Sequence, residues 1–332
     1  MASSPCRRLR VAAEHVSAAR LPCPDPAAAG WSSAEPQPRI RGQFDTFGYF
    51  VERGLYTPAE VASFHERYES EFPPEPMSVH GSADRKNRGP ATRYTPGFPK
   101  GSPFRDFMLD NPRVLDRIED CLGTDFLWLT AATVRFGGET PWHWDYSPEG
   151  GNDYPRVKVI MYLDDLSTPG NGSLGLIPGS HYASYRHALR QTLRREPETS
   201  ERDGVTIGDE LGAPVWGDEL TPLGVSPLEV PCVQTLTSPA DIVFFNPLTF
   251  HSSFGASNHL PGNRPGGKRT FQLIFGKAPG DNDEWMKNIR GLVGTRTDHP
   301  EKVMLSTHAQ LAQTARDPRL RRAAQWIVDE VL

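Results

Sequence analysis

With 332 residues, the chain is long enough to form one large all-β domain with helical additions or two small domains. Its formal net charge of −5 gives no reason to expect nucleic acid or an anionic membrane surface as a partner, and its apolar runs are far too short to span a bilayer. The four cysteines are scattered and form no CxxC pair, which argues against a cysteine metal site or a disulfide framework and favours a reducing, cytoplasmic location.

Residues 1–38 differ in composition from the rest of the chain. They are rich in Ala, Ser, Pro and Arg and contain three acidic residues. This composition predicts a flexible N-terminal tail. An organelle-targeting peptide is the alternative, because Arg-rich, acid-poor segments can act in that way, whereas the lack of an apolar stretch argues against secretion.

The first ordered elements are expected near Phe44. A strand is predicted over residues 47–51, and a helix is predicted to begin at Thr57. Thr57 can cap this helix, Pro58 suits its first turn, and Glu60 completes a capping box.

The segment that follows is irregular and basic. Six Lys and Arg residues lie within 85–105, with no acidic residue among them. This stretch is either a solvated loop or a rim that attracts an anionic substrate. A short helix is predicted after it, over residues 114–121.

From residue 126 onward, short apolar runs alternate with turns, for which the chain has 30 glycines and 32 prolines. Such a series predicts an all-β core with flanking helices, of the sandwich or jelly-roll class. The chain has no βαβ rhythm, no GxGxxG and no P-loop sequence, so a doubly wound nucleotide-binding fold is not expected. The predicted strands cover residues 126–136, 157–163, 174–177, 242–245 and 270–275.

A long insertion interrupts this series at residues 184–230, first helical over 185–195 and then Gly-rich. A stretch of this length inside a compact domain usually has a function, so we expect either a lid over a small ligand or a docking surface. Helical patterning returns at residues 281–332, with the last helix expected over 318–332. The predicted organisation is therefore a tail, one β domain over residues 39–280 and a C-terminal helical extension.

The pattern His143-Trp144-Asp145 is a candidate metal site. Residues i and i+2 of a strand point to the same side, so His143 and Asp145 can supply two ligands together. Two imidazoles and one carboxylate suit iron(II), because they leave coordination positions open for a cosubstrate and dioxygen. His251 follows a buried-strand signal at residues 241–246 and is the candidate for the third ligand. Trp144 would then point away from the metal.

Other residues of the metal-ligand or acidic types are interpreted differently. His299, in a second His-x-acid pattern, opens a predicted helix with no strand beside it. His181 follows Pro-Gly-Ser and is expected to shape a turn. Asp164 and Asp165 follow a strand and are also interpreted as turn residues.

Several short motifs occur in a characteristic order along the chain. They are Trp142-His143-Trp144-Asp145, Tyr162-Leu163-Asp164-Asp165, Asn171-Gly172-Ser173-Leu174 and Ile177-Pro178-Gly179-Ser180-His181, preceded by Gly48-Tyr49-Phe50-Val51. In this combination the chain resembles the phytanoyl-CoA dioxygenase family over residues 43 to 278. The resemblance implies a double-stranded β-helix, iron(II) as the metal, and 2-oxoglutarate and dioxygen as cosubstrates, with release of succinate and CO2. It also leaves room for stimulation by ascorbate.

The resemblance assigns the metal ligands. His143 and Asp145 match the first two ligands of the family and His251 matches the distal one. Related halogenases have Gly or Ala at the place of Asp145, which frees a position for chloride. The carboxylate of Asp145 therefore argues against halogenation.

The resemblance also assigns residues to the cosubstrate. Ser253 matches a serine that is often close to the cosubstrate carboxylate, and Arg93 is the candidate for a basic residue contributed from before the core. Arg269 matches the anchoring arginine, since a guanidinium binds a carboxylate through two parallel hydrogen bonds. The interval from His251 to Arg269 is longer than usual in the family. Arg264 lies nearer but sits in a Gly-rich turn, and a strand fixes a side chain better.

The expected function is an iron(II)- and 2-oxoglutarate-dependent dioxygenase that hydroxylates, or otherwise oxidises a C–H bond of, a small molecule in specialised metabolism. The basic stretch at 85–105 favours an anionic substrate. One alternative is a cupin-like metal-dependent binding protein or isomerase without 2-oxoglutarate turnover, against which Arg269 and Ser253 argue. Another is a protein or nucleic-acid hydroxylase, and the acidic net charge weighs against nucleic acid. No pattern predicts an oligomeric state.

Overall fold

The computed structural model describes most of the chain from Pro38 onward. The predicted tail lies outside the described part except for Pro38, and so do His299, Arg264 and much of the basic stretch. The described residues are 38–71, 93–96, 104–136, 140–145, 153–167, 172–193, 199–202, 204–207, 215–216, 223–225, 231–253, 268–294 and 301–331.

Two antiparallel sheets form the core of this described part, which confirms the predicted all-β core. The first sheet has the strand order β1-β12-β5-β14-β3-β2. Its strands are β1 (Tyr49–Glu52), β2 (Arg93–Pro96), β3 (Phe126–Phe136), β5 (Arg156–Tyr162), β12 (Ile242–Phe245) and β14 (Lys268–Lys277).

The second sheet has the order β7-β8-β4-β13-β6-β11-β10-β9. Along the chain, β3 to β6 and β11 to β14 pass back and forth between the two sheets, so residues far apart in sequence face each other across the interior. The strands of this sheet are β4 (Thr140–His143), β6 (Gly175–Leu176), β7 (Thr199–Arg202), β8 (Gly204–Ile207), β9 (Val215–Trp216), β10 (Leu223–Val225), β11 (Pro231–Gln234) and β13 (His251–Ser253).

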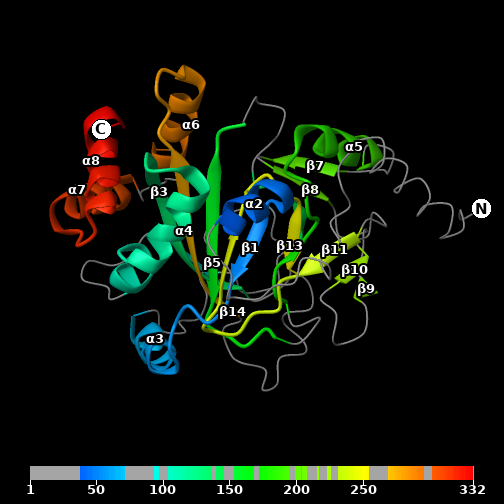
Figure 1. The fold of residues 1–332 in the computed structure, drawn as a ribbon, viewed down its shortest axis with the longest axis horizontal. Helices are drawn as coiled ribbons and strands as arrows, with labels where there is room; N and C mark the ends of the chain where they lie inside the picture. The colour runs from blue at the N-terminus through cyan, green and yellow to red at the C-terminus, as the bar shows by residue number, and fades with distance from the viewer. Residues whose placement is uncertain are drawn as a thin grey trace, which may run out of the picture.

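The outer face of the first sheet is covered by helices. Figure 1 shows α4, α7 and α8 on one side of this sheet and the strands of the second sheet on the other. Phe271, Leu273 and Phe275 of β14 belong to the large apolar cluster on this outer face, together with residues of α3 and α4. The helices are α2 (Pro38–Phe47), α3 (Pro58–Glu71), α4 (Pro112–Leu122), α5 (Ala183–Leu193), α6 (Asp283–Gly294), α7 (Glu301–Thr314) and α8 (Pro318–Val331), with a π-helical turn at Arg105–Leu109.

The inner face of the first sheet is turned toward the second sheet. Ile160 and Tyr162 of β5 and Phe245 of β12 pack there against Leu176 and Val233 of the second sheet. Successive residues of a strand point to opposite faces, so each strand of the first sheet contributes alternately to the outer and inner clusters. Both sets are buried, and the inner face is where the site described below lies.

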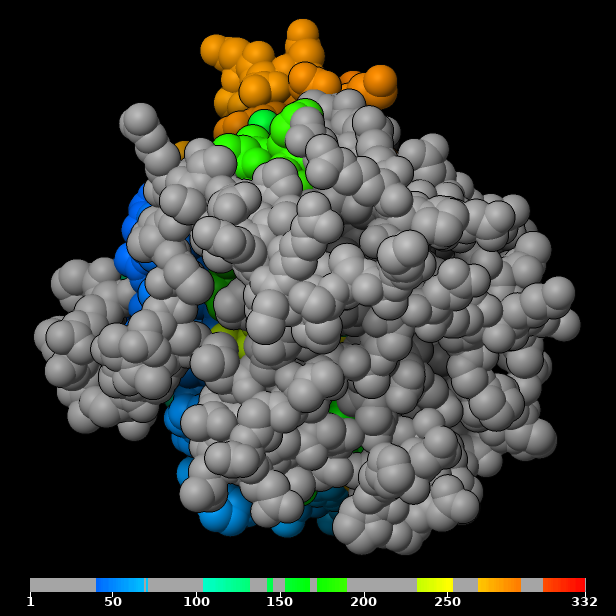
Figure 2. Space-filling view, turned by 90° about the vertical axis from the view of Figure 1, so that its right-hand side faces the viewer, coloured from blue at the N-terminus to red at the C-terminus, as the bar shows by residue number. Residues whose placement is uncertain are grey.

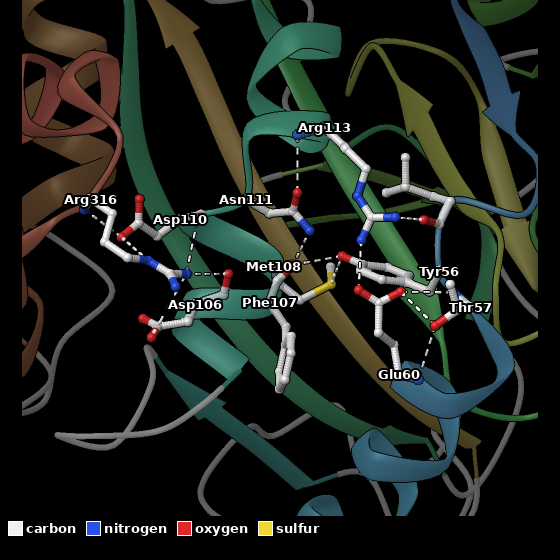
Figure 3. A network of polar contacts seen from close by, with 11 residues as sticks. Tyr56, Thr57, Glu60, Asp106, Phe107, Met108, Asp110, Asn111, Arg113 and Arg316 are labelled. Atoms are coloured by element: carbon white, nitrogen blue, oxygen red, sulfur yellow. Dashed lines mark hydrogen bonds and ion pairs between the residues drawn. The ribbon is translucent and has the colours of Figure 1, made fainter.

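Polar contacts attach the C-terminal extension to the core. The carboxylate of Asp110 accepts hydrogen bonds from the backbone N–H groups of Arg316 (2.7 Å) and Asp317 (2.9 Å), at the start of α8 (Figure 3). Asp110 itself is buried and lies directly after the π-helical turn. The predicted C-terminal helices are confirmed, and these contacts tie them to the segment that leads into α4.

The start of α3 and the start of α4 are joined in the same network. Thr57 and Glu60 form the predicted capping box, since the Thr57 N–H donates to the Glu60 carboxylate (2.7 Å) and the Glu60 N–H to the Thr57 hydroxyl (3.3 Å). Asn111 caps α4 by accepting from the N–H of Arg113 (3.0 Å). The Arg113 guanidinium then reaches Glu60 at 2.8 Å (Figure 3). Local capping signals therefore predicted real helix starts.

Three expectations for the first part of the chain were wrong in detail. Ordered structure was expected to begin near Phe44, but α2 already covers Pro38–Phe47. The strand expected over residues 47–51 begins at Tyr49, because α2 continues to Phe47 and Gly48 ends it with φ of 80°. A side chain at Gly48 would also lie 2.3 Å from the hydroxyl of Thr249. The segment expected to be irregular contains β2 at the edge of the first sheet.

The predicted insertion contributes more than its first helix. After α5, the short strands β7 and β8 extend one edge of the second sheet, and β9 and β10 extend the other. In the view from the side of the second sheet, α6 stands at the top and α3 lies at the bottom, so these helices mark opposite ends of the two-sheet core (Figure 2). None of the helices within the described residues combines the length and the apolar character that crossing a membrane requires.

Candidate metal centre

The three predicted ligands meet at the ends of two neighbouring strands. His143 is the last residue of β4 and His251 is the first residue of β13, and the two are directly paired across the antiparallel ladder. Directly paired residues lie close enough for their side chains to touch, and the two imidazole centroids are 4.2 Å apart. Asp145 follows two residues after His143, and its N–H donates to the carbonyl of Pro247 (3.2 Å).

The donor atoms converge on one point. Oδ1 of Asp145 lies 3.5 Å from Nε2 of His143 and 3.7 Å from Nε2 of His251. One ligand atom from each residue falls within 4.8 Å of the other two, which is a separation that a single ion can bridge. Among the residues that the structure describes, this is the one grouping of His, Cys and acidic side chains that could hold a metal.

His251 is held in the form that a metal needs. Its Nδ1 lies 2.8 Å from the carbonyl of Thr249, which makes Nδ1 the protonated nitrogen and leaves the lone pair on Nε2, toward Asp145. Burial, together with the neighbouring His143, lowers the pKa of His251 to about 3. The imidazole is therefore neutral over the physiological pH range, as a metal ligand must be.

Asp145 has a second partner that sequence reasoning missed. Its Oδ2 accepts a hydrogen bond from Nζ of Lys158 at 2.9 Å, while Oδ1 faces the two imidazoles. Burial by itself would raise the pKa of Asp145, but the Lys158 ammonium and the two histidines outweigh burial and hold that pKa well below its ordinary range. The available signal was a single lysine inside the apolar run that follows Arg156 in β5, since Lys is rarely buried without a partner.

With this geometry established, comparison with known proteins identifies the family. The family model of phytanoyl-CoA dioxygenase (PhyH) matches residues 44–260, which include all three ligands. The chain belongs to this family. No curated protein matches the chain in sequence.

Several solved structures match the chain at low identity. HygX from Streptomyces hygroscopicus with nickel and 2-oxoglutarate bound has 20% identity and a TM-score of 0.48, covering 72% of this chain and 87% of that chain. The epimerase SnoN in complex with Fe3+, alpha ketoglutarate and nogalamycin RO has 18% identity and a TM-score of 0.49, covering 82% and 93%. EctD from S. alaskensis with bound Fe has 17% identity and a TM-score of 0.47, covering 74% and 79%. These ligands are those of the matched proteins.

Aromatic side chains surround the centre in this PhyH-family chain. Trp142 and Trp144 are both buried, with ring centroids 5.5 and 4.3 Å from that of Phe250. The ring of Phe245 lies edge-on to His251 at 4.9 Å. The two tryptophans flank His143 in sequence but pack on Phe250, as expected if His143 and Asp145 point the other way.

Arg269 has a partner that the sequence did not reveal. Its Nη2 lies 2.7 Å and its Nε 3.2 Å from Oδ1 of Asp164, and its N–H donates to Oδ2 at 2.8 Å. The guanidinium also lies 5.9 Å from the ring of Tyr68, a residue of the outer cluster. Arg269 is thus on the outer face of the first sheet, bound to a buried carboxylate. This placement argues against the predicted role of Arg269 as a cosubstrate anchor. It also shows that Asp164, which was interpreted as a turn residue, is the binding partner of Arg269.

The other predicted site residues are placed only by their backbone. Ser253 lies on β13 opposite Thr140 of β4, two residues after the distal ligand. Arg93 lies at the start of β2, opposite Arg135 of β3. The roles of both toward a cosubstrate remain predictions. Of the basic stretch, Arg105 forms an ion pair with Asp106 at 2.8 Å.

His181 is a structural residue in this fold, as predicted from its turn. Its Nε2 lies 3.0 Å from the carbonyl of Asp45, and its ring centroid lies 4.3 Å from that of Tyr182, with the two rings tilted by 35°. Burial lowers its pKa to about 4. The imidazole therefore packs against the α2–β1 connection in its neutral form.

Proposed function

We propose that this chain is a mononuclear non-haem iron(II) oxygenase that uses 2-oxoglutarate and dioxygen to oxidise a C–H bond of a small molecule. The observation that carries the proposal is the convergence of His143, Asp145 and His251 in a member of the phytanoyl-CoA dioxygenase family. Hydroxylation is the expected outcome, with succinate and CO2 as coproducts.

The donor set fits iron(II). Two neutral imidazoles and one carboxylate, all on one side of the ion, leave positions open for a chelating cosubstrate and for dioxygen. Thiolates would favour zinc or a cluster instead, and the described cysteines, Cys121 and Cys232, are buried and outside the grouping. When bound, iron and 2-oxoglutarate would supply the oxidising power for hydrogen abstraction.

The residues of the chain would hold and orient this chemistry. The Thr249 carbonyl fixes the tautomer of His251, and Lys158 occupies the Asp145 oxygen that faces away from the imidazoles. Asp145 would therefore bind the metal through Oδ1 alone. A carboxylate ligand at this position favours hydroxylation over halogenation.

The proposed fold is a double-stranded β-helix. Support comes from the way β3 to β6 and β11 to β14 pass between two antiparallel sheets, with the ligands on β4, just after it, and on β13. The insertion would act as a lid, because β8 pairs with β4 at His143 itself. A substrate from specialised metabolism, with a preference for anionic compounds, remains the proposed class.

A second candidate function is metal-dependent binding or isomerisation without 2-oxoglutarate. The observation that favours it is the occupation of Arg269 by Asp164, since a free Arg269 was one argument for a dicarboxylate cosubstrate. The two candidates differ in whether the metal centre binds 2-oxoglutarate.

The test is anaerobic addition of iron(II) and 2-oxoglutarate to the purified protein, with detection of the weak visible charge-transfer band of the chelate. We expect the band in the wild type and in His187→Ala, a matched variant at an exposed histidine on α5, but not in His143→Ala. Iron binding without a band would favour the second candidate. A band that survives His143→Ala would refute the assigned metal centre.

A further inference from the structure

We propose that Lys158 of β5 binds an oxyanion group of the substrate, a carboxylate, sulfate or phosphate, beside the candidate metal centre. This inference rests on the proposed function. It goes beyond a general preference for anionic compounds, because it names the residue that binds the charge and sets that charge close to the carbon that is oxidised.

The surroundings of the Lys158 ammonium leave it donors to spare. On β5, Lys158 pairs with Phe245 of β12 on one side and with Ile274 of β14 on the other, and both neighbours are apolar. The centroid of the Phe245 ring lies 5.6 Å from Nζ. Within the described residues, the hydrogen bond to Oδ2 of Asp145 at 2.9 Å is the one that Nζ makes. An ammonium has three donors, so two remain for a partner that enters from the interior.

Accessible surface adjoins the same ammonium. The side chains of Lys158 and Asp145 are 11% and 13% exposed, and that of His143 is 19% exposed. His251, on the other side of the carboxylate, is 4% exposed. A molecule that approaches the candidate ligands from the accessible side therefore also meets Lys158.

Two other cations on this inner face are enclosed. Arg156 has the same strand parity as Lys158, and both Arg156 and Lys268 are 1% exposed. The Arg156 guanidinium lies 5.5 Å from the ring of Tyr154, and Nζ of Lys268 donates to the carbonyl of Gly172. Of these three cations, Lys158 is the one with accessible surface beside a candidate metal ligand.

The charge of the proposed centre gives the reason for an anion. Iron(II) would bring two positive charges, and histidine binds a metal in its neutral form. The carboxylate of Asp145 and that of a chelating 2-oxo acid would therefore balance the metal by themselves. The ammonium of Lys158 then adds one positive charge that no group of the centre balances. An oxyanion of the substrate would balance it through a charge-assisted hydrogen bond.

This position of the charge limits the substrate. One oxygen of Asp145 accepts from Nζ of Lys158, and the other faces the imidazoles of His143 and His251. An oxyanion bound to Lys158 would thus lie beside the metal, close to the C–H bond that reacts. Compounds whose charge is far from any reactive C–H bond should be poor substrates.

The experiment uses two small probes of similar shape, methanesulfonate, which is an oxyanion, and dimethyl sulfone, which is neutral. Protein loaded with iron(II) and 2-oxoglutarate is titrated anaerobically with each probe at constant ionic strength, and the shift of the charge-transfer band gives Kd. Wild type should bind methanesulfonate roughly 10- to 100-fold more tightly than dimethyl sulfone, the ratio expected for a hydrogen bond to a charged group.

Variants assign the preference to one residue. Lys158→Met, loaded at saturating iron(II) and 2-oxoglutarate, should bind both probes equally weakly, because it keeps the length of the side chain and loses the charge. Lys158→Arg keeps the charge and should retain the preference. Lys277→Met, at an exposed lysine of β14, is the matched control and should give the Kd values of wild type.

Two results would overturn the inference. One is a wild type that does not distinguish the probes or binds neither, which requires no variant to fold. The other is a preference for methanesulfonate that survives in Lys158→Met, and if that variant then also loses affinity for 2-oxoglutarate, Lys158 serves the cosubstrate instead. If wild type shows no band on addition of 2-oxoglutarate, the proposed function fails first, and the inference falls with it.

Discussion

The two faces of the first sheet differ in the partners of their buried charged side chains. On the outer face, Arg269 is neutralised by Asp164 within an apolar cluster covered by helices. On the inner face, Lys158 donates to Asp145, a candidate metal ligand, and Lys268 donates to a backbone carbonyl and lies 5.9 Å from the centroid of the Tyr162 ring. Consecutive residues of one strand, Lys268 and Arg269, therefore lie on opposite faces of the sheet and have different partners. Substitutions on the outer face should change stability, and substitutions on the inner face should change binding.

The largest expected effect is a loss of stability caused by a substitution on the outer face. Asp164→Ala should lower the free energy of unfolding by about 3–5 kcal/mol, because it leaves the buried Arg269 guanidinium without its carboxylate. Chemical denaturation of the metal-free protein measures this change. Replacing both residues by leucine should restore much of the lost stability, since no buried charge then remains.

Iron affinity measured on the Asp164→Ala variant below its unfolding transition provides the contrast between the faces. It should stay within about threefold of wild type, because the pair does not touch the metal centre. A large loss of iron affinity with little loss of stability would contradict the division of tasks between the faces.

An intermediate effect is expected on iron(II) affinity, from a substitution on the inner face beside Asp145. Lys158→Met removes the hydrogen bond to Oδ2 of Asp145 and the charge that lowers its pKa, so iron(II) affinity should fall roughly 10- to 100-fold. Competition with a chelator measures it. Lys277→Met, at an exposed lysine of β14, is the matched control and should change nothing.

The stability of Lys158→Met is the second readout. Lys158→Met leaves the Asp145 carboxylate of the metal-free protein without its cation, so the free energy of unfolding should fall, but by less than in Asp164→Ala, because the Lys158–Asp145 pair is more exposed than the Asp164–Arg269 pair. Unchanged iron affinity in this variant would show that the Lys158–Asp145 contact does not support the metal centre.

The smallest expected effect is on the pH dependence of stability. It concerns His181, which belongs neither to the candidate metal centre nor to the Asp164–Arg269 pair. Burial holds the pKa of His181 at about 4, below the value of about 6.5 in the unfolded chain, so the unfolded state binds more protons between these values. Stability should therefore be complete above pH 6.5 and fall by roughly 1–3 kcal/mol as the pH drops toward 4. Urea denaturation of metal-free wild type and His181→Gln at several pH values measures this contribution. An identical pH dependence in the two proteins would contradict it.

Much of the site could be predicted from local sequence. The spacing of His143 and Asp145 and the buried-strand signal before His251 predicted the three residues that converge. The capping box of Thr57 and Glu60 predicted the start of α3, because caps act between residues three apart in the chain. The helices of the C-terminal extension were predicted for the same local reason.

Partners across the sheet were not predictable in this way. Asp164 and Arg269 are 105 residues apart, and Lys158 reaches Asp145 from another sheet. Gly48 was not expected to end a helix, because its close approach to Thr249 depends on a contact 201 residues away.

By itself, the sequence predicted the three residues that converge at the candidate metal centre, the class of core and the helices that begin with local caps. Only the tertiary structure decided which side of β14 faces the candidate metal centre. The pattern of this strand could not show it, because both faces are buried and apolar residues occur on each. A shift of one residue in strand phase exchanges the two faces, so the placement of Lys268 on the inner face and Arg269 on the outer face depended on the pairing of β14 with β5 and β3.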